Sequence, residues 1–306
     1  ITQCDNTAPK VLTPKLKLKT RLDDIPPSVL KHETIRGGAA LLKDQASCAF
    51  RAFANWRLHT KPQAKHDIGI DAKTRGIITH HILESIWQQL QSHHQLLAMS
   101  ETDLDSLIKN EVNKAIQRHI PQSLIALETT RLTQLIHNWL KHEKNRTPFN
   151  IHALELKQKI TLGPLTLSVQ IDRIDSLPSG QHILIDYKTG LASPMDWLGT
   201  RPLQPQLPLY AVAHDTPLAA ISFAHVTVKA MRFNGIALDQ DTLIGCKQID
   251  TQKAFLDSLE HQCLDWTNNL TELATAFHLG DARINPKNTS VCQYCELDSL
   301  CRVTNR

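Results

Sequence analysis

The sequence predicts an α/β (α+β) fold in which a central mixed sheet is flanked by helices. Apolar residues recur at helical spacing between about residues 41 and 144, alternation replaces that spacing over 151–172, and a buried strand follows at 182–188. A further helical stretch follows the strands, at about residues 252–279. Helical segments on both sides of one run of strands favour a sheet covered by helices over an all-helical or all-β domain.

Length and composition limit the class of protein. The 306 residues suffice for one large domain or two small ones, and 41% hydrophobic with 21% charged residues is typical of a soluble globular chain. A net charge of +4 permits a basic groove but does not by itself identify a nucleic-acid binder. With no signal peptide and no apolar run of membrane-spanning length, we predict a cytoplasmic protein without a membrane partner. The chain begins at Ile1 rather than Met, which suggests part of a longer protein.

The N-terminal half is predicted to be an arm followed by helices. Residues 1–45 are rich in Lys, Pro and Thr with weak periodicity, which indicates an extended arm or linker before a domain at 46–306. A helix at about 41–58 contains Cys48, and a strong helix at about 74–91 begins at Asp71 or Thr74, either of which is a good N-cap. Two amphipathic helices, at about 101–119 and 128–144, form a predicted helical insert spanning about 95–148.

The strands follow in a predicted core at about residues 150–235. Alternation over 151–162 and 165–172, with Gly163-Pro164 between them, predicts a β-hairpin, and a third strand runs from His182 to Lys188. After a Pro-rich loop come a short helix at Gln206–Tyr210 and a strand-like segment at 219–233. The long helix at 252–279 and an irregular, cysteine-bearing tail complete the chain over 250–306.

Two carboxylates and a lysine are predicted to converge where the strands end. Residues i and i+2 of a strand point to the same face, so Asp186 and Lys188 emerge side by side, and Asp172 lies on a neighbouring strand. Such a set can hold a divalent cation and a water, as metal-assisted phosphodiester cleavage requires, with Lys188 helping to orient or deprotonate that water. The alternative is purely structural: an Asp186–Lys188 or an Asp172–Arg173 ion pair.

Four further side chains are weaker candidates for the same site. His80 lies on the helix at 74–91, with His81 as a rival that its chemistry does not separate. Glu155 is either an additional carboxylate near the metal or a solvated strand residue. Gln206 and Tyr210 share one helical face and are suited to hold a DNA backbone or the catalytic strand.

Seven cysteines in a chain without a secretion signal argue against a disulfide framework. Cys292, Cys295 and Cys301 form a compact set of thiolate donors that needs a fourth ligand for zinc or a [4Fe–4S] cluster. Cys48 is the candidate, and a buried apolar cysteine is the alternative. The remaining cysteines are predicted to be unliganded: Cys4, Cys246 and Cys263.

Six short motifs in this order resemble the RecB-like branch of the PD-(D/E)XK nuclease superfamily, and more closely the C-terminal iron–sulfur nuclease domain of AddB-type DNA repair proteins. The resemblance extends from about Gly37 to Arg302. The motifs are Cys48-Ala49-Phe50-Arg51-Ala52-Phe53, Arg75-Gly76-Ile77-Ile78-Thr79-His80 with Leu83-Glu84, Ile171-Asp172-Arg173-Ile174-Asp175, Asp186-Tyr187-Lys188-Thr189-Gly190, Gln206-Leu207-Pro208-Leu209-Tyr210, and the terminal cysteine triplet. Two positions depart from the family pattern: Ala49 stands where proline is frequent and Gln170 where glycine is common.

The resemblance implies a restriction-endonuclease-like core and a role for each motif. The implied ligands of Mg²⁺ or Mn²⁺ are His80, chosen over His81 by the family spacing, together with Asp172, Asp186 and the Tyr187 carbonyl. Lys188 is the implied catalytic lysine, and Gln206 with Tyr210 the accessory motif. The implied [4Fe–4S] ligands, which close the domain by tying its two ends together, are Cys48, Cys292, Cys295 and Cys301.

The function implied is metal-dependent hydrolysis of DNA, by an exonuclease module of a DNA repair or recombination protein. Single-stranded or duplex DNA ends are the expected substrate, and a helicase or a helicase-like region of the full-length protein is an expected partner. The alternative is a non-catalytic DNA-end-binding or scaffolding module of a helicase–nuclease complex.

Overall fold

A computed structural model describes residues 26–30, 35, 37–60, 69–293 and 295–302. Most of the predicted arm, including residues 1–25, therefore lies outside the described residues. The end of that predicted arm is helical rather than extended, because a helix begins at Gly38. Within the described ranges, no helix combines the length and the apolar character needed to cross a membrane.

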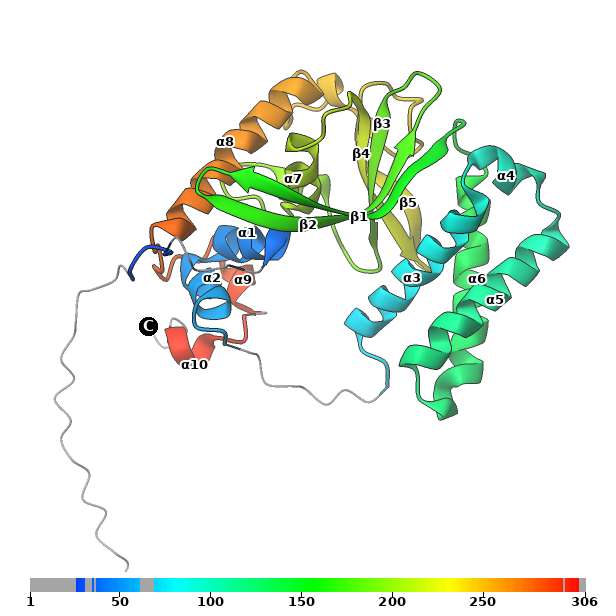
Figure 1. Cartoon of the computed structure of the whole chain (residues 1–306), viewed down its shortest axis with the longest axis horizontal. Coiled ribbons are helices and arrows are strands. Elements are labelled where there is room, and N and C mark those ends of the chain that lie inside the picture. Colours follow the sequence, from blue (N-terminus) through cyan, green and yellow to red (C-terminus); the bar gives the residue numbers. More distant parts are fainter. Residues whose placement is uncertain (1–25, 31–34, 36, 61–68, 294, 303–306) are drawn as a thin grey trace, which may run out of the picture.

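The centre of the molecule is a mixed six-stranded sheet with its strands in sequence order, β1 to β6 (Figure 1). The strands are β1 (Asn150–Leu162), β2 (Leu165–Ser176), β3 (His182–Lys188), β4 (Leu218–Thr227), β5 (Ala230–Ala237) and β6 (Lys247–Gln248). The β1–β2, β2–β3 and β4–β5 pairs are antiparallel, whereas β3–β4 and β5–β6 are parallel. The predicted mixed sheet flanked by helices is confirmed.

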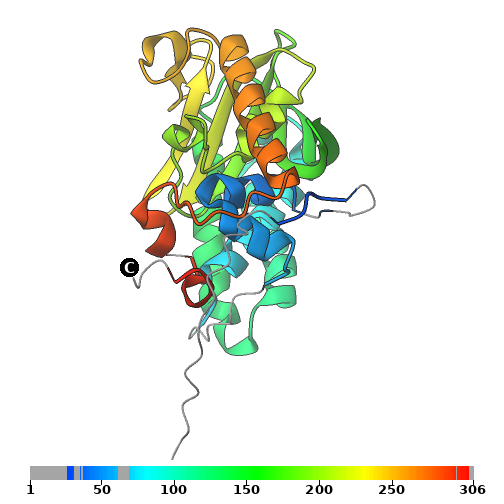
Figure 2. The same ribbon diagram turned by 90° about the vertical axis from the view of Figure 1, so that its left-hand side faces the viewer.

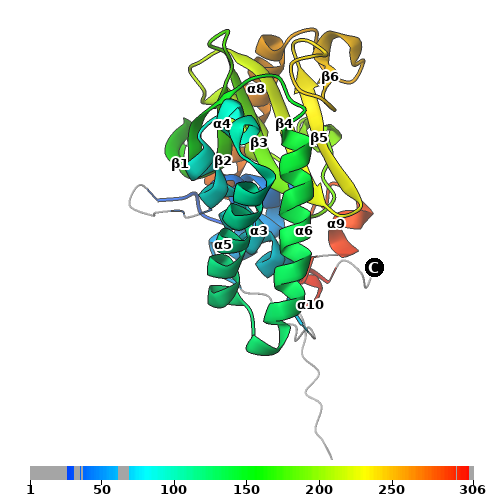
Figure 3. The same cartoon turned by 90° about the vertical axis from the view of Figure 1, so that its right-hand side faces the viewer.

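Helices cover both faces of this sheet (Figures 2 and 3). On one face lie α3 (Ala72–Leu90), α4 (His93–Ala98), α5 (Glu101–His119) and α6 (Ile125–Glu143). On the other lie α1 (Gly38–Ser47), α2 (Ala49–Trp56), α7 (Gln206–Val212) and α8 (Leu259–His278), and the short helices α9 (Thr289–Gln293) and α10 (Asp298–Cys301) lie beside α2. Each face has its own apolar core, so the sheet is buried on both sides.

Strand β3 shows how this layering positions the acidic residues. Ile183, Ile185 and Tyr187 pack into the core beneath α3 and α6, whereas Leu184 packs into the core beneath α7 and α8. The two-residue period of a strand then places Asp186 and Lys188 on the side of Leu184. In agreement, the Lys188 ammonium lies 5.5 Å from the ring centre of Phe223, a member of the same core.

Three element boundaries differ from those expected. The predicted helix at 41–58 is broken at Cys48, which has extended backbone and ends α1 while preceding α2. The strand-like segment at 219–233 is two antiparallel strands, β4 and β5. The long C-terminal helix begins at Leu259, where the Ser258 hydroxyl accepts a hydrogen bond from the His261 N–H and caps the first turn.

The C-terminal tail docks against the break between α1 and α2 through backbone hydrogen bonds. The Phe50 N–H donates to the Arg283 carbonyl at 3.0 Å, and the Lys287 N–H donates to the Ser47 carbonyl at 2.9 Å. The Ala49 N–H donates to the Asn285 side chain at 2.9 Å. These contacts bring the two ends of the described chain together, as Figure 2 shows for the blue and red segments.

Candidate functional site

The candidate site lies where strands β2 and β3 separate. Their ladder pairs Arg173 with Ile185 and continues only toward Ser176 and His182. Beyond it, the Asp172 carboxylate accepts the Tyr187 backbone N–H at 2.8 Å, so a side chain takes the place of a strand partner. The carboxylate of Asp172 is thereby fixed beside the end of β3, where Asp186 and Lys188 lie.

His80 of α3 bridges two acceptors at this point. Its Nε2 lies 2.9 Å from the Tyr187 carbonyl oxygen, and its Nδ1 lies 3.3 Å from Asp172 Oδ2. Burial lowers the pKa of His80, but the hydrogen bond to Asp172 and the negative charges of Asp172 and Asp186 outweigh it, and the net shift is upward. A carbonyl and a carboxylate both accept hydrogen bonds, so this position of the ring favours either a proton on each ring nitrogen or a cation bound beside the ring.

Asp186 is a buried carboxylate with a single partner. Its side chain is 1% exposed and forms an ion pair with Lys188, and among the described residues neither carboxylate oxygen has another hydrogen-bond partner. Burial raises the pKa of Asp186 to about 6, against the attraction of the Lys188 charge. A buried carboxylate whose one partner is a single ammonium keeps free lone pairs that a cation can bind, so this donor set fits a divalent metal ion. The Asp186–Lys188 ion pair foreseen as an alternative is also present.

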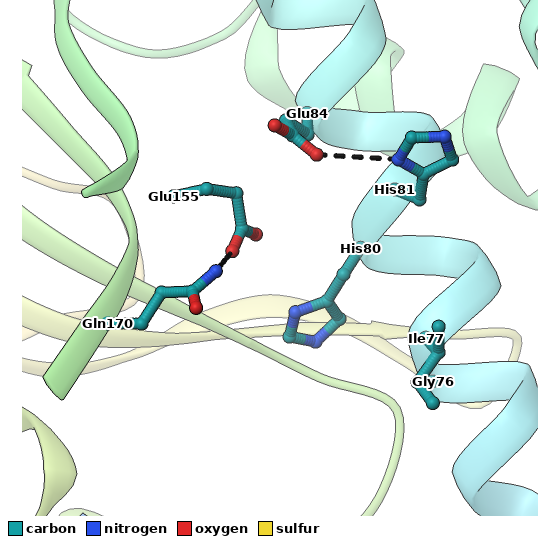
Figure 4. A pocket seen from close by; sticks show the side chains of 7 residues that line it. All are labelled: Gly76, Ile77, His80, His81, Glu84, Glu155 and Gln170. Atoms are coloured by element: carbon teal, nitrogen blue, oxygen red, sulfur yellow. Dashed lines mark hydrogen bonds and ion pairs between the residues drawn. The ribbon is translucent and has the colours of Figure 1, made fainter. Parts of the chain in front are cut away.

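Glu155 joins the site from β1. Ligand atoms of His80, Glu155 and Asp172 all lie within 4.8 Å of one another, a spacing that suits one metal ion. In Figure 4, the Glu155 and His80 side chains point toward the same space from β1 and α3, while Gln170 donates a hydrogen bond to Glu155. This space is a pocket of about 480 Å³. Glu155 has a positive φ of 47° inside a strand, an unfavourable backbone conformation of the kind that often marks functional sites.

Gln206 and Tyr210 approach from α7. The Gln206 side-chain amide donates to the Gln170 carbonyl oxygen at 3.2 Å, next to Glu155 in the pocket. The Tyr210 hydroxyl is buried and, among the described residues, has no hydrogen-bond partner. Burial, followed by the negative charges of Asp172, Asp186 and Glu155, raises the pKa of Tyr210. The hydroxyl therefore remains a neutral donor facing the acidic residues.

Directly behind the site lies a buried network of four charges. Arg173 contacts Asp175 through its Nε at 2.6 Å and Glu143 through Nη1 at 2.8 Å. Arg146 contacts the same two carboxylates, each at 2.7 Å. Arg173 Nη1 also donates to the Tyr187 hydroxyl at 3.0 Å. Because Tyr187 belongs to β3, the network fixes the strand whose carbonyl and flanking side chains form the site.

This network corrects one sequence-based alternative and reveals partners that were missed. Arg173 turns away from Asp172 and pairs with Asp175 and Glu143, so the proposed Asp172–Arg173 ion pair is wrong. Successive residues of a strand face opposite sides, which separates the two side chains. Glu143 and Arg146 were not predicted, although their position in the turn that ends α6 placed opposite charges three residues apart.

The four cysteines of the predicted cluster lie in one region of the fold. Cys48, at the break between α1 and α2, is 7% exposed, and its thiol lies near the docked tail, 3.9 Å from the Arg283 carbonyl. The pKa values of Cys292 and Cys295 are raised by burial first, and then in both cases by the charges of Cys48 and Cys301. Among the described residues, no three of these sulfur atoms lie within 4.8 Å of one another, so the thiols are neighbours without forming a closed metal site.

Two other described cysteines behave as apolar core residues. Burial raises the pKa of Cys246 to about 12 and that of Cys263 to about 11. Cys246 lies in one hydrophobic core and Cys263 packs against the other, so both behave as small apolar side chains rather than as metal-binding thiolates. Cys4 lies outside the described residues.

Comparisons with known proteins agree with this architecture. The sequence model of the family described as "PD-(D/E)XK nuclease superfamily" matches residues 40–302, which is most of the chain. A search of curated proteins returned no match. Among solved structures, one titled "Crystal structure of SSO0001" is 15% identical, covering 85% of this chain and 93% of that one with a TM-score of 0.32, a likeness too slight to carry an argument. On the family match over residues 40–302, the chain belongs to the PD-(D/E)XK nuclease superfamily.

Proposed function

We propose that the protein is a Mg²⁺- or Mn²⁺-dependent deoxyribonuclease that hydrolyses phosphodiester bonds. Membership of the superfamily supports nuclease activity with a divalent metal. The observation that carries the proposal is the Asp186 carboxylate, which is buried and, among the described residues, has no partner other than the Lys188 ammonium. A structural ion pair alone does not account for the ligand atoms of His80, Glu155 and Asp172, which lie within 4.8 Å of one another.

In this proposal the metal is held by Asp172, Asp186, His80 and the Tyr187 carbonyl, with Glu155 as a further carboxylate. When bound, the ion supplies charge neutralisation at the phosphate and acidifies a water molecule. Lys188 donates hydrogen bonds to the attacking water and offsets the charge that develops on the phosphate oxygens.

The accessory residues act on the protein and on the DNA strand. The Gln206 amide fixes the Gln170 backbone, and through it the strand beside Glu155. The Tyr210 hydroxyl, kept neutral by burial, donates a hydrogen bond toward the substrate phosphate or the acidic residues. Hydrolysis leaves a 5′-phosphate and a 3′-hydroxyl.

His80 and His81 provide a matched pair for testing the metal site. His80→Ala removes a ring that lies 3.3 Å from Asp172, so we expect Mn²⁺ affinity to fall at least about tenfold and cleavage to fall with it. His81 lies 3.4 Å from Glu84 instead, and His81→Ala is expected to leave both nearly unchanged. Isothermal titration with Mn²⁺ measures the affinities. Equal losses in the two variants would contradict the assignment of His80.

The same proposal covers the branch of the superfamily, the biological role, the cluster and the division of the chain. The motif set supports the RecB-like branch and an AddB-type module, acting as an exonuclease on DNA ends in repair, with a helicase or helicase-like region as partner. A [4Fe–4S] cluster held by Cys48, Cys292, Cys295 and Cys301 would tie the chain ends, as the mutual influence of these thiols supports. The division into an arm, a helical insert and a nuclease core, and the cytoplasmic location, also remain predictions.

A cleavage assay with end-labelled single-stranded and duplex DNA, in Mg²⁺ or Mn²⁺, tests the main proposal. Lys188→Met keeps a similar apolar stem but loses the ammonium, so we expect cleavage to fall at least about 100-fold while DNA binding persists. Tight DNA binding without metal-dependent cleavage by the unaltered protein would instead support the non-catalytic end-binding module. Unchanged cleavage by Lys188→Met would reject the catalytic role of the lysine.

A further inference from the structure

A second pocket, of about 330 Å³, lies between the α1–α2 pair, the loop before α7 and helix α9. It is distinct from the pocket beside Glu155 and shares none of its lining residues. The lining residues are Lys43, Ser47, Arg51, Asp196, Leu203, Gln204, Ser290 and Val291. The lining is therefore mostly polar, with two cations, two hydroxyls and an amide.

The pocket lining carries two cations, Lys43 and Arg51, and one carboxylate, Asp196. Among the described residues, Lys43 forms no ion pair. Arg51 is oriented by Asp44, whose carboxylate contacts its Nε at 2.8 Å and also accepts from Trp56 at 3.0 Å. The one carboxylate in the lining, Asp196, already accepts the Ser193 N–H within a capping box.

The cations of the pocket interact electrostatically with both the candidate site and the cysteines. Burial, followed by the positive charges of Lys188 and Arg51, lowers the pKa of Lys43, and Asp186 acts on it in the opposite sense. Lys43 therefore lies within electrostatic reach of the Asp186–Lys188 pair. The charge of Arg51 acts on the Cys295 thiol. Lys43 and Arg51 thus line one pocket, and the charge of Lys188 is felt at Lys43.

We propose that this pocket binds a backbone phosphate of the DNA strand, neighbouring the phosphate that is cleaved, with Lys43 and Arg51 as direct contacts. Lys43, which has no ion-pair partner among the described residues, and Arg51, which Asp44 holds in place, line the pocket with hydroxyl and amide donors. Such a set suits a phosphate diester and offers no pattern for reading a base. The inference rests on the proposed function, because the pocket is assigned to a phosphate on the same DNA strand as the one that the candidate site would cleave. It assigns the α1–α2 pair a role in holding substrate.

Lys43→Gln tests the proposal, with binding measured by fluorescence anisotropy of short single-stranded oligonucleotides of two sequences in metal-free buffer. Loss of one charged contact is expected to weaken binding about tenfold, equally for both sequences. The slope of log K against log salt should become shallower by about 0.7, the value for one phosphate contact on a single strand. Lys43→Arg should retain most of the affinity and the slope.

Two further variants distinguish a loss of DNA binding in this pocket from a general effect of changing the protein's charge. Gln204→Glu places a carboxylate in the pocket without changing side-chain shape and should weaken binding comparably. Lys109→Gln removes an exposed lysine of α5, on the opposite face of the sheet, and should bind like the unaltered protein. If the unaltered protein cleaves DNA but Lys43→Gln binds with unchanged affinity and slope, the pocket assignment is wrong. If the unaltered protein shows no metal-dependent cleavage, the proposed function itself fails.

Discussion

Replacing Asp186 with asparagine is expected to abolish metal-dependent DNA cleavage while making the metal-free protein more stable. Asparagine has nearly the same shape but offers a weaker, neutral ligand to the metal, so we expect cleavage to fall by at least about 1000-fold. In the absence of metal, the same change removes a buried carboxylate whose one partner among the described residues is the Lys188 ammonium. Lys188, whose side chain is 24% exposed, can still be solvated after its partner is neutralised.

The stability gain should depend on pH in a defined direction. Burial raises the pKa of Asp186 to about 6, from 3.8, so the folded metal-free protein holds this proton more tightly than the unfolded chain. The folded state consequently loses stability as pH rises from about 4 to about 6, and the loss persists above that range. Asparagine cannot ionise and avoids the loss, which amounts to about 1–3 kcal/mol at pH 8.

Melting curves in chelator at pH 4 and pH 8 measure this effect. We expect Asp186→Asn to melt roughly 2–10 °C above the unaltered protein at pH 8, with a much smaller difference at pH 4. Added Mn²⁺ should stabilise the unaltered protein more than the variant, because only the former binds it well. Asp241→Asn, an exposed position on the loop after β5, is the matched control. A variant that is less stable at pH 8 would show that Asp186 acts as a structural ion-pair partner.

Cys48→Ala is expected to destabilise the protein as strongly as Cys301→Ala, although the two residues lie at opposite ends of the described chain. If the four cysteines hold one cluster, losing any ligand removes a cross-link whose binding free energy is coupled to folding. A loss of about 2–5 kcal/mol would lower the melting temperature by roughly 5–15 °C. Metal analysis and visible absorbance of protein prepared without oxygen should show iron in the unaltered protein and little in either variant.

Cys263→Ala is the matched control for the cysteine prediction. Its thiol lies against the core beneath α8, so the substitution removes one sulfur atom without touching the proposed ligands. We expect it to keep the metal and to melt near the unaltered protein. Retention of both metal and melting temperature by Cys48→Ala would rule it out as the fourth ligand, and stoichiometric zinc in colourless protein would refute the iron–sulfur assignment.

Local sequence pattern predicted the elements best where periodicity and turn residues agree. β3 runs from His182 to Lys188 as expected, because an apolar run lies between glycine-bearing turns at Gly180 and Gly190. The turn between β4 and β5, at Val228 and Lys229, contains no glycine, proline or asparagine, so one strand was expected instead of two. The break at Cys48 likewise has no helix-breaking residue, and tertiary contacts with the tail create it.

The candidate site shows a similar division. Strand spacing was enough to predict Asp186, Lys188 and Asp172 together, and the motif resemblance selected His80. One partner of Arg173, Glu143, lies on α6, thirty residues away, and no local pattern connects them. The pocket lined by Lys43 and Arg51 arises from packing between elements. Sequence therefore predicted the residues of the candidate site, whereas three-dimensional contacts determine what holds them in place.

The docked tail has a consequence for the order in which the protein matures. The Ala49 N–H donates to Asn285, a hydrogen bond that a proline at this position could not donate because it has no N–H. Arg201 adds hydrogen bonds to the Ala46, Ser47 and Asn285 carbonyls, at 2.8, 3.1 and 2.8 Å. None of these contacts involves a thiol. We therefore expect the apo chain to hold residues 283–287 in place and to present its cysteines to an incoming cofactor, so that cofactor insertion completes folding rather than initiating it.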